Sequence, residues 1–243
     1  MNRIALVTGG TGAIGTEICR ALQAQGCRVA ALGHPSESAR IEAWRASLGF
    51  PCEAALCDLG HFDDAGAAIA ALERSLGPVD ILVNAAGITR DARLAKMQPQ
   101  AWREVISSNL DSVFNATKPV FEGMCARGYG RIVNISSVNG QKGQFGQANY
   151  SAAKAGMHGF TMAVAQEGAA KGVTVNTVSP GYVETPMTAA IKPDVLAKIV
   201  GSVPMGRMAK PVEIARAVAF LCSDDAAYIT GANLAVNGGL YMS

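Results

Sequence analysis

Charged and aromatic residues are scarce in this sequence of 243 residues, making up 16% and 6% of it. The formal net charge is only +2, and the Lys and Arg residues are scattered, with no run that could follow a phosphate backbone. We therefore expect no nucleic-acid partner. A hydrophobic content of 49% with so little charge excludes a disordered chain and is typical of a compact globular protein.

Cysteine patterns and long hydrophobic runs are also missing. The six cysteines form no CxxC pair and have no metal-ligand spacing with the three histidines. We therefore expect small buried side chains in a reducing cytosol, and no metal site. No apolar run reaches membrane-spanning length, and the run at residues 4–7 is too short for a signal peptide. These absences predict a soluble cytoplasmic protein without a membrane partner.

Glycine is abundant, with 27 residues, and short apolar runs alternate with longer amphipathic ones. The apolar runs predict strands at residues 3–8, 28–32, 52–57, 81–84, 131–136, 174–179 and 233–236. The amphipathic runs predict helices at residues 12–25, 39–48, 62–76, 99–127, 150–171 and 211–222. This alternation predicts one α/β domain over residues 1–243, a Rossmann-type doubly wound parallel sheet flanked by helices on both faces.

One long irregular section, residues 180–211, interrupts this alternation. We expect a short helix within it, near residues 192–200. Long loops inside compact domains are usually functional, so this section is predicted to be a lid over a site.

A glycine-rich turn follows the first predicted strand directly, with Thr8, Gly9, Gly12 and Gly15 leading into a helix. Such glycines allow the backbone to turn sharply and to approach a pyrophosphate, whose charge meets the helix N-terminus. The pattern is weak when taken alone, because many similar turns bind nothing. Its place after the first strand of an alternating α/β pattern favours a dinucleotide site.

The second and third predicted strands bear on which nucleotide binds. The second strand ends without an acidic residue, whereas an acid there would bind ribose hydroxyls and favour NAD. Arg40, with Ser36 or Ser38, could meet a 2′-phosphate, which favours NADPH, although Arg40 could equally be a solvated helix residue. Glu37 would oppose a phosphate if it pointed inward. Asp58, at the end of the third strand, either accepts from the adenine amino group or caps a helix.

Tyr150 and Lys154 lie four residues apart in a predicted helix and therefore share one face. An ammonium beside a phenol favours the phenolate and lowers a pKa that is otherwise about 10. A hydroxyl from the end of the fifth strand, Ser136 or Ser137, would complete a pocket for a carbonyl oxygen. Such a pocket suits proton transfer coupled to hydride transfer.

These residues occur in the order found in the short-chain dehydrogenase/reductase family, which the whole chain resembles. The motifs that carry the resemblance are Thr8, Gly9, Gly15, Asn84, Ala86, Gly87, Asn109, Ser137, Tyr150, Lys154, Pro180 and Gly181. The chain departs from the family at Ala13, where a glycine is commoner. It departs again at Ala85, where a second asparagine usually helps to stabilise the central sheet.

The resemblance implies a role for each residue of the catalytic set. Tyr150 would protonate the substrate carbonyl oxygen in reduction, and Lys154 would hold the nicotinamide ribose and lower the tyrosine pKa. Ser137, selected over Ser136 by its thirteen-residue distance from the tyrosine, would orient the carbonyl. Asn109 would interrupt helix hydrogen bonding and hold a water in a proton relay.

The resemblance also implies a nucleotide-binding part at about residues 1–90 and a catalytic and substrate part at about 91–243. Relatives are commonly homotetramers that pack helices like 99–127 and 150–171 across their interfaces. The implied cofactor-binding residues are Thr8, Gly9, Gly12, Ile14, Gly15, Ser36, Arg40, Asp58, Asn84, Ala86, Gly87, Tyr150, Lys154, Pro180, Gly181, Val183 and Thr185.

Residues 131–147, together with 88–91 and 178–182, resemble acetoacetyl-CoA reductases, which supply (R)-3-hydroxybutyryl-CoA for polyhydroxybutyrate synthesis. That likeness implies an acyl pocket with Asp91 near its entrance. Its apolar walls would shield a short acyl chain, and its glutamines would donate to carbonyl oxygens. The implied substrate-binding residues are Asp91, Ser137, Gln144, Phe145, Gln147, Tyr150 and Tyr182.

Two alternative functions stay open. Residues 220–231 and 236–242 look equally like 3-oxoacyl-(acyl-carrier-protein) reductases, for which Arg127 and Lys171 would be contacts to an acidic carrier. We favour the CoA thioester, because the segment that forms the pocket should discriminate more than the C-terminal part. A nucleotide-binding sensor of the same fold is the third reading, although such a protein would have no need of Ser137, Tyr150 and Lys154.

Overall fold

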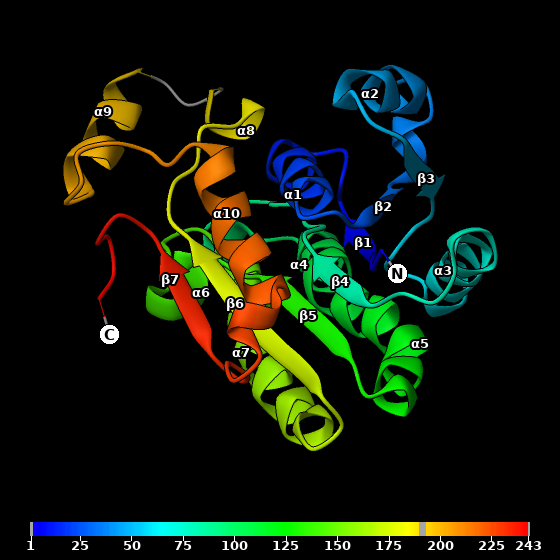
Figure 1. Ribbon diagram of the computed structural model, residues 1–243. Helices are drawn as coiled ribbons and strands as arrows, with labels where there is room; N and C mark the ends of the chain where they lie inside the picture. Colours follow the sequence, from blue (N-terminus) through cyan, green and yellow to red (C-terminus); the bar gives the residue numbers. More distant parts are fainter. Residues whose placement is uncertain (1, 190–192, 243) are drawn as a thin grey trace.

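The computed structural model describes residues 2–189 and 193–242, which form one α/β domain around a seven-stranded sheet (Figure 1). Every strand pair is parallel, and the strand order is β3-β2-β1-β4-β5-β6-β7. The strands are β1 (Ile4–Thr8), β2 (Arg28–Gly33), β3 (Cys52–Leu56), β4 (Ile81–Asn84), β5 (Gly130–Ile135), β6 (Val173–Pro180) and β7 (Asn233–Val236). The predicted Rossmann-type parallel sheet is confirmed.

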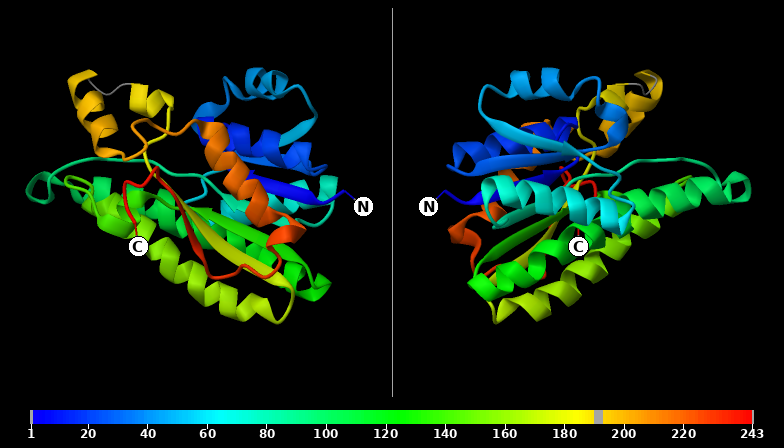
Figure 2. Two further views of the ribbon diagram at one scale, coloured as in Figure 1. Left: turned by 60° about the vertical axis from the view of Figure 1, so that its left-hand side comes forward. Right: turned by 90° about the vertical axis from the view of Figure 1, so that its right-hand side faces the viewer.

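Helices cover both faces of the sheet (Figure 2). One face packs against α1 (Ala13–Ala24), α2 (Ile41–Leu48) and α10 (Pro211–Cys222). The opposite face packs against α3 (Phe62–Leu76), α5 (Ser112–Arg127) and α7 (Ala148–Ala169). The four central strands are buried at every position, which explains why they read as continuous apolar runs.

The predicted single helix at residues 99–127 is divided in the structure. It consists of α4 (Pro99–Ile106), a π-helical turn at Ser107–Asp111, and α5. The side-chain amide of Asn109 donates to the carbonyl of Val105 at 2.8 Å. In a regular α-helix the backbone N–H of residue 109 binds that carbonyl. The side chain therefore competes with the backbone here, and the helix widens by one residue.

Several short elements were not predicted from the sequence. They are α6 (Val138–Lys142), α8 (Pro186–Ala189) and the 3₁₀ turns at Pro35–Glu37, Leu94–Lys96 and Asp224–Ala226. Each is too short to show a hydrophobic period. The helix predicted at 192–200 corresponds to α9 (Pro193–Ser202), while its first residue, Lys192, lies outside the described residues. Within the described part of the chain, no helix has the length and apolarity needed to cross a bilayer.

A chain of buried polar side chains links the centre of the sheet to α7. Asn84 on β4 donates to Asn134 on β5 at 2.8 Å, and Asn134 donates to Thr161 on α7 at 2.8 Å. The hydroxyls of Thr161 and Thr177, the latter on β6, are 2.8 Å apart. Polar groups this deeply buried need partners, and these supply one another. The sheet is therefore bridged at its centre although Ala85 replaces the usual second asparagine.

Candidate active site

The glycine turn, Asn84, Ser137 and Pro180 lie at the carboxyl ends of β1, β4, β5 and β6, on the side where the chain continues from β6 into α8 (Figure 1). The ends of β1 and β4 are joined by the hydroxyl of Thr8. It accepts from the backbone N–H groups of Ala85 at 3.1 Å and Ala86 at 3.2 Å. Ligands of open parallel sheets bind at this edge, outside the carboxyl ends of the strands.

The glycine-rich turn between β1 and α1 is built for close backbone approach. Gly9 has φ +61°, and a Cβ on it would lie 2.8 Å from the Cα of Ala86. A Cβ on Gly15 would overlap the carbonyl oxygen of Gly9. Gly12 precedes α1, whose first turn carries no acidic residue. The turn therefore exposes a helix N-terminus that fits the pyrophosphate of a dinucleotide.

The residues predicted to select the nucleotide are already engaged with other groups. Arg40 forms an ion pair with Glu37. The hydroxyl of Ser36 lies 2.8 Å from Nδ1 of His34. Asp58 accepts from the backbone N–H of Gly60 at 2.9 Å and so shapes the loop before α3. The sequence did not show which way Glu37 points. In the structure its carboxylate points inward, toward the glycine-rich turn.

The structure distinguishes the two serines at the end of β5. The hydroxyl of Ser136 donates to the backbone carbonyl of Lys154 at 2.8 Å, so it is committed to holding α7. Ser137 is the N-cap residue of α6, and its side-chain oxygen accepts from the backbone N–H of Asn139 at 3.1 Å. The Ser137 side chain also lies close enough to the Tyr150 phenol to oppose the rise in the pKa of that phenol. Ser137 is therefore the serine that shares the site with the tyrosine.

Tyr150 and Lys154 lie on one face of α7, as predicted, and burial shifts the pKa of each. The Lys154 Nζ lies 5.5 Å from the centre of the Tyr150 ring. Burial raises the pKa of Tyr150 to about 12, and the Asp91 carboxylate adds to that rise, while the Ser137 side chain opposes it. Burial lowers the pKa of Lys154 to about 7. Burial dominates both shifts, because it disfavours both charged forms, and the lowering of the tyrosine pKa by Lys154 stays a prediction.

Lys154 and Asn109 are both buried and face Gly87. The Lys154 Nζ donates to the carbonyl of Ile135 at 2.8 Å, which leaves further protons to donate. The Asn109 amide donates to the carbonyls of Ile88 and Val105, whereas its Oδ1 is buried without a partner in the described chain. A Cβ on Gly87 would overlap that Oδ1 and lie 3.4 Å from Nζ. A free acceptor and a free donor on one side fit a hydroxyl-bearing guest such as a ribose or a water.

A series of hydrogen bonds between side chains connects Asp91 to the loop at Ser137. The Gln147 amide donates to Asp91 at 2.8 Å, and its oxygen accepts from Asn139 at 2.8 Å. The N–H of Asn139 in turn donates to Ser137. Gln147 is therefore held by both of its polar ends. Sequence reasoning missed Asn139, whose place in α6 gives it this role.

Sequence reasoning also missed Asn149, at the start of α7. It is fully buried, accepts from the N–H of Tyr150 at 2.8 Å and donates to the carbonyl of Arg90 at 3.1 Å. It thereby fixes the backbone that carries the phenol. An asparagine beside a tyrosine gave no signal in the sequence, because its partners lie on a distant loop.

The remaining predicted acyl-pocket residues are not enclosed together. Phe145 is 79% exposed, with the guanidinium of Arg93 5.5 Å from its ring centre. The Gln144 oxygen accepts from Lys142 at 3.2 Å. Tyr182 borders a small cavity beside β7. In the described structure Gln147 therefore lies at the site, whereas the Phe145 ring is exposed to solvent.

The segment after β6 returns to the sheet edge, where four cofactor contacts were predicted at Pro180, Gly181, Val183 and Thr185. The N–H of Gly181 donates to the carbonyl of Val236 at 3.0 Å, and Val183 is 5% exposed. Pro180 ends β6. These residues line the same edge as the glycine turn. Among the described residues, no group of three or more His, Cys, Asp or Glu side chains could hold a metal ion.

Several known proteins are similar to this chain along most of its length. A family model described as enoyl-(acyl carrier protein) reductase matches residues 10–241. An acetoacetyl-CoA reductase of Allochromatium vinosum is 60% identical, and the match covers 100% of both chains. An acetoacetyl-CoA reductase of Cupriavidus necator is 54% identical over 99% of this chain and 98% of the relative. A 3-oxoacyl-[acyl-carrier-protein] reductase of Escherichia coli is 45% identical, with the same coverage of 99% and 98%.

Proposed function

We infer that this chain, which belongs to the short-chain dehydrogenase/reductase family, reduces acetoacetyl-CoA to (R)-3-hydroxybutyryl-CoA with a nicotinamide dinucleotide. The main support is that the Ser137 side chain acts on the phenol of Tyr150, with the buried Lys154 ammonium 5.5 Å from the centre of the same ring. Two hydroxyl donors that meet can converge on one carbonyl oxygen. This arrangement favours a carbonyl substrate over the enoyl substrate named by the family model. The acetoacetyl-CoA reductases among the relatives support the choice of thioester.

The residues present fit a nicotinamide dinucleotide. The glycine turn and the N-terminus of α1 would hold its pyrophosphate, and Lys154 with Asn109 would bind ribose hydroxyls or a water next to them. When bound, the nicotinamide supplies a hydride to the carbonyl carbon. The chain itself provides the binding, the orientation and the proton.

Ser137 and Tyr150 act together on the substrate oxygen. Ser137 would donate a hydrogen bond that orients the carbonyl and stabilises its developing negative charge. With a pKa raised to about 12, Tyr150 is protonated at neutral pH and is ready to act as the acid. As hydride reaches carbon, the phenol O–H would transfer its proton to oxygen, and the phenolate would recover a proton through Lys154 and Asn109.

The carrier-protein alternative finds less support in the described surface. Arg127, one of its two predicted contacts, donates to the carbonyl of Val79 at 2.6 Å and lies 3.6 Å from Asp80. It is therefore engaged within the chain. Lys171 is exposed and remains available. The 45% identity to the relative from Escherichia coli still supports this alternative.

The test compares kcat/KM on acetoacetyl-CoA with kcat/KM on acetoacetyl bound to acyl carrier protein, at one nucleotide concentration. We expect the CoA thioester to be favoured about tenfold or more, which is ~1.4 kcal/mol of transition-state binding. A clear preference for the carrier form contradicts the proposal and favours the alternative. Nucleotide binding without turnover of either thioester identifies a sensor.

We also propose a cytoplasmic location, a place in polyhydroxybutyrate synthesis and a lid role for residues 180–211. The six cysteines all lie in described residues and are free thiols, which supports a reducing, cytoplasmic compartment. The product is the one that polyhydroxybutyrate synthesis consumes, which the likeness to acetoacetyl-CoA reductases supports. A lid role for residues 180–211 is supported by α8 and α9, which follow β6 directly at the site edge (Figure 1).

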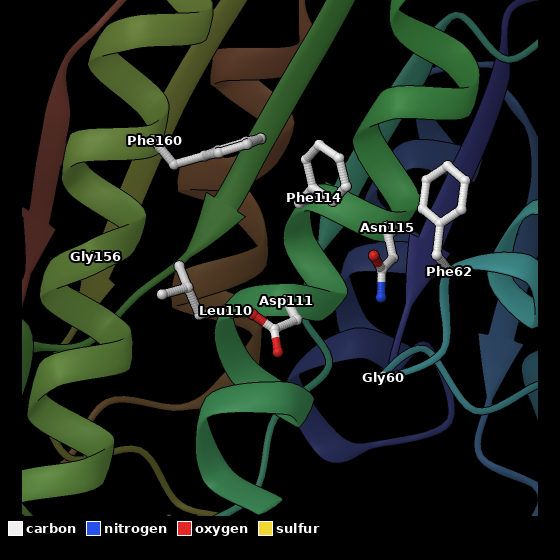
Figure 3. A pocket seen from close by; sticks show the side chains of 8 residues that line it. All are labelled: Gly60, Phe62, Leu110, Asp111, Phe114, Asn115, Gly156 and Phe160. Atoms are coloured by element: carbon white, nitrogen blue, oxygen red, sulfur yellow. The ribbon is translucent and has the colours of Figure 1, made fainter. Parts of the chain in front are cut away.

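A homotetramer is also part of the proposal. Figure 3 shows Phe62 at the start of α3, Phe114 on α5 and Phe160 on α7 around one pocket. The rings of Phe62 and Phe114 stack at 5.8 Å, and their side chains are 41% and 47% exposed. Exposed aromatic rings mark interaction surfaces, and two of these rings lie on α5 and α7, the helices expected at the interfaces of relatives. Light scattering should give about four times the chain mass of 25.1 kDa.

A further inference from the structure

An acidic side chain occupies the edge of the predicted nucleotide site where β2 ends. Glu37 closes the 3₁₀ turn Pro35–Glu37 and folds back toward the glycine-rich turn. Its Oε2 accepts from the hydroxyl of Thr11 at 2.5 Å and from the N–H of His34 at 3.1 Å. A Cβ on Gly33, the last residue of β2, would lie 2.6 Å from the same oxygen. The carboxylate therefore lies directly against the strand end.

This carboxylate is ionised at neutral pH. Burial acts to raise the pKa of Glu37, but hydrogen bonds from Thr11, Arg40 and His34 outweigh it and lower the pKa below its usual value. The side chain is only 17% exposed, so the charge is poorly screened by solvent. A fixed negative charge thus faces whatever binds beside the end of β2.

The cation expected to bind a 2′-phosphate is neutralised by this acid. Arg40 pairs with Glu37, and it is the only Lys or Arg in residues 33–41. The pair has no net charge, whereas a 2′-phosphate needs a positive site. The Ser36 hydroxyl faces His34. The segment thus offers a carboxylate acceptor in place of a phosphate-binding site.

We propose that Glu37 makes NADH the preferred hydride donor over NADPH, by accepting from the adenosine ribose hydroxyls and repelling a 2′-phosphate. This inference rests on the proposed nicotinamide-dependent reduction and specifies its cofactor. It reverses the expectation drawn from the sequence, where β2 ends without an acid. The 3₁₀ turn carries an acid back to that place from four residues further along the chain.

The test measures the dissociation constants of NADH and NADPH by nucleotide fluorescence without thioester, and kcat/KM for each with acetoacetyl-CoA. We expect the wild-type chain to bind NADH at least about tenfold more tightly, a difference of ~1.4 kcal/mol. Glu37→Gln should reduce this preference about tenfold, mainly by tightening NADPH binding. Glu42→Gln is the matched control, because Glu42 is an exposed acid of α2 paired with Arg45, and it should leave the ratio unchanged.

The outcomes separate this inference from the proposed function. A wild-type preference for NADPH, or an unchanged ratio in Glu37→Gln, overturns the inference even if acetoacetyl-CoA is reduced. Tighter NADH binding without thioester turnover supports the inference and contradicts the proposed function. The wild-type ratio decides by itself if the variant does not fold.

Discussion

Replacing Tyr150 with Phe lowers kcat on acetoacetyl-CoA by about 10³-fold or more, because the variant loses the acid that protonates the substrate oxygen. The ring itself stays in place, since the Tyr150 backbone is held by Asn149 and α7 is unchanged. Ser137, which acts on the phenol, is still present in the variant. Nucleotide affinity should therefore stay within a few-fold of the wild-type value.

The measurement pairs steady-state kinetics with nucleotide titration of the same preparations. Tyr228→Phe is the matched control, because Tyr228 is fully exposed on the surface and its hydroxyl has no predicted role. We expect the control to behave as wild type. Turnover by Tyr150→Phe near the wild-type rate contradicts the assignment of the phenol as the acid.

Replacing Lys154 with Met should abolish most turnover and at the same time stabilise the nucleotide-free protein. Lys154 is 3% exposed, and burial lowers its pKa from 10.5 to about 7. That shift corresponds to an unfavourable burial of roughly 4 kcal/mol at neutral pH. Met keeps the volume without the charge and gives up one hydrogen bond to Ile135, worth about 1 kcal/mol. Thermal unfolding should therefore shift upward by several degrees.

The pH dependence of stability gives a second readout of the same variant. Because the folded-state pKa of Lys154 lies below its unfolded value, the unfolded chain binds more protons between about pH 7 and 10.5. The Lys154 contribution to stability therefore rises with pH across that window and is absent from Lys154→Met. Lys171→Met, at an exposed lysine, is the control. A destabilised Lys154→Met protein at pH 7 shows instead that the ammonium is charged and well paired.

Turnover by Lys154→Met should fall by at least about 10²-fold, the scale expected when a positioning contact is lost. Loss of turnover with a gain in stability is the combination expected of a residue held for function at the expense of the fold. A loss of turnover accompanied by a loss of stability shows instead that Lys154 mainly supports packing.

The sheet was predictable from the sequence because its physical cause is local and strong. Central parallel strands are buried on both faces, so each one appears as an uninterrupted apolar run. The glycine turn was predictable for a similar reason, since Gly9 and Gly15 occupy positions where a Cβ does not fit. Periodicity could not reveal the π-helical turn, because it depends on one side chain, Asn109, competing for one carbonyl.

The electrostatics of the site were less predictable. Spacing showed correctly that Tyr150 and Lys154 share a helix face, but it could not show that Lys154 is buried and Tyr150 only partly exposed. Burial raises the pKa of Tyr150, an effect that helix spacing could not reveal. The sequence also could not show which way the Glu37 side chain points, because this depends on the 3₁₀ turn that directs it inward. Charge placement at this site is thus a property of the folded chain.

The central claim is that this chain is a 3-oxoacyl thioester reductase working through Tyr150. It is tested most directly by mixing the wild-type chain, reduced nicotinamide dinucleotide and acetoacetyl-CoA, following nicotinamide absorbance and determining the configuration of the alcohol. We expect one nicotinamide to be oxidised for each thioester consumed, with (R)-3-hydroxybutyryl-CoA as the product. Bound nucleotide that stays reduced, or an (S)-alcohol, contradicts it.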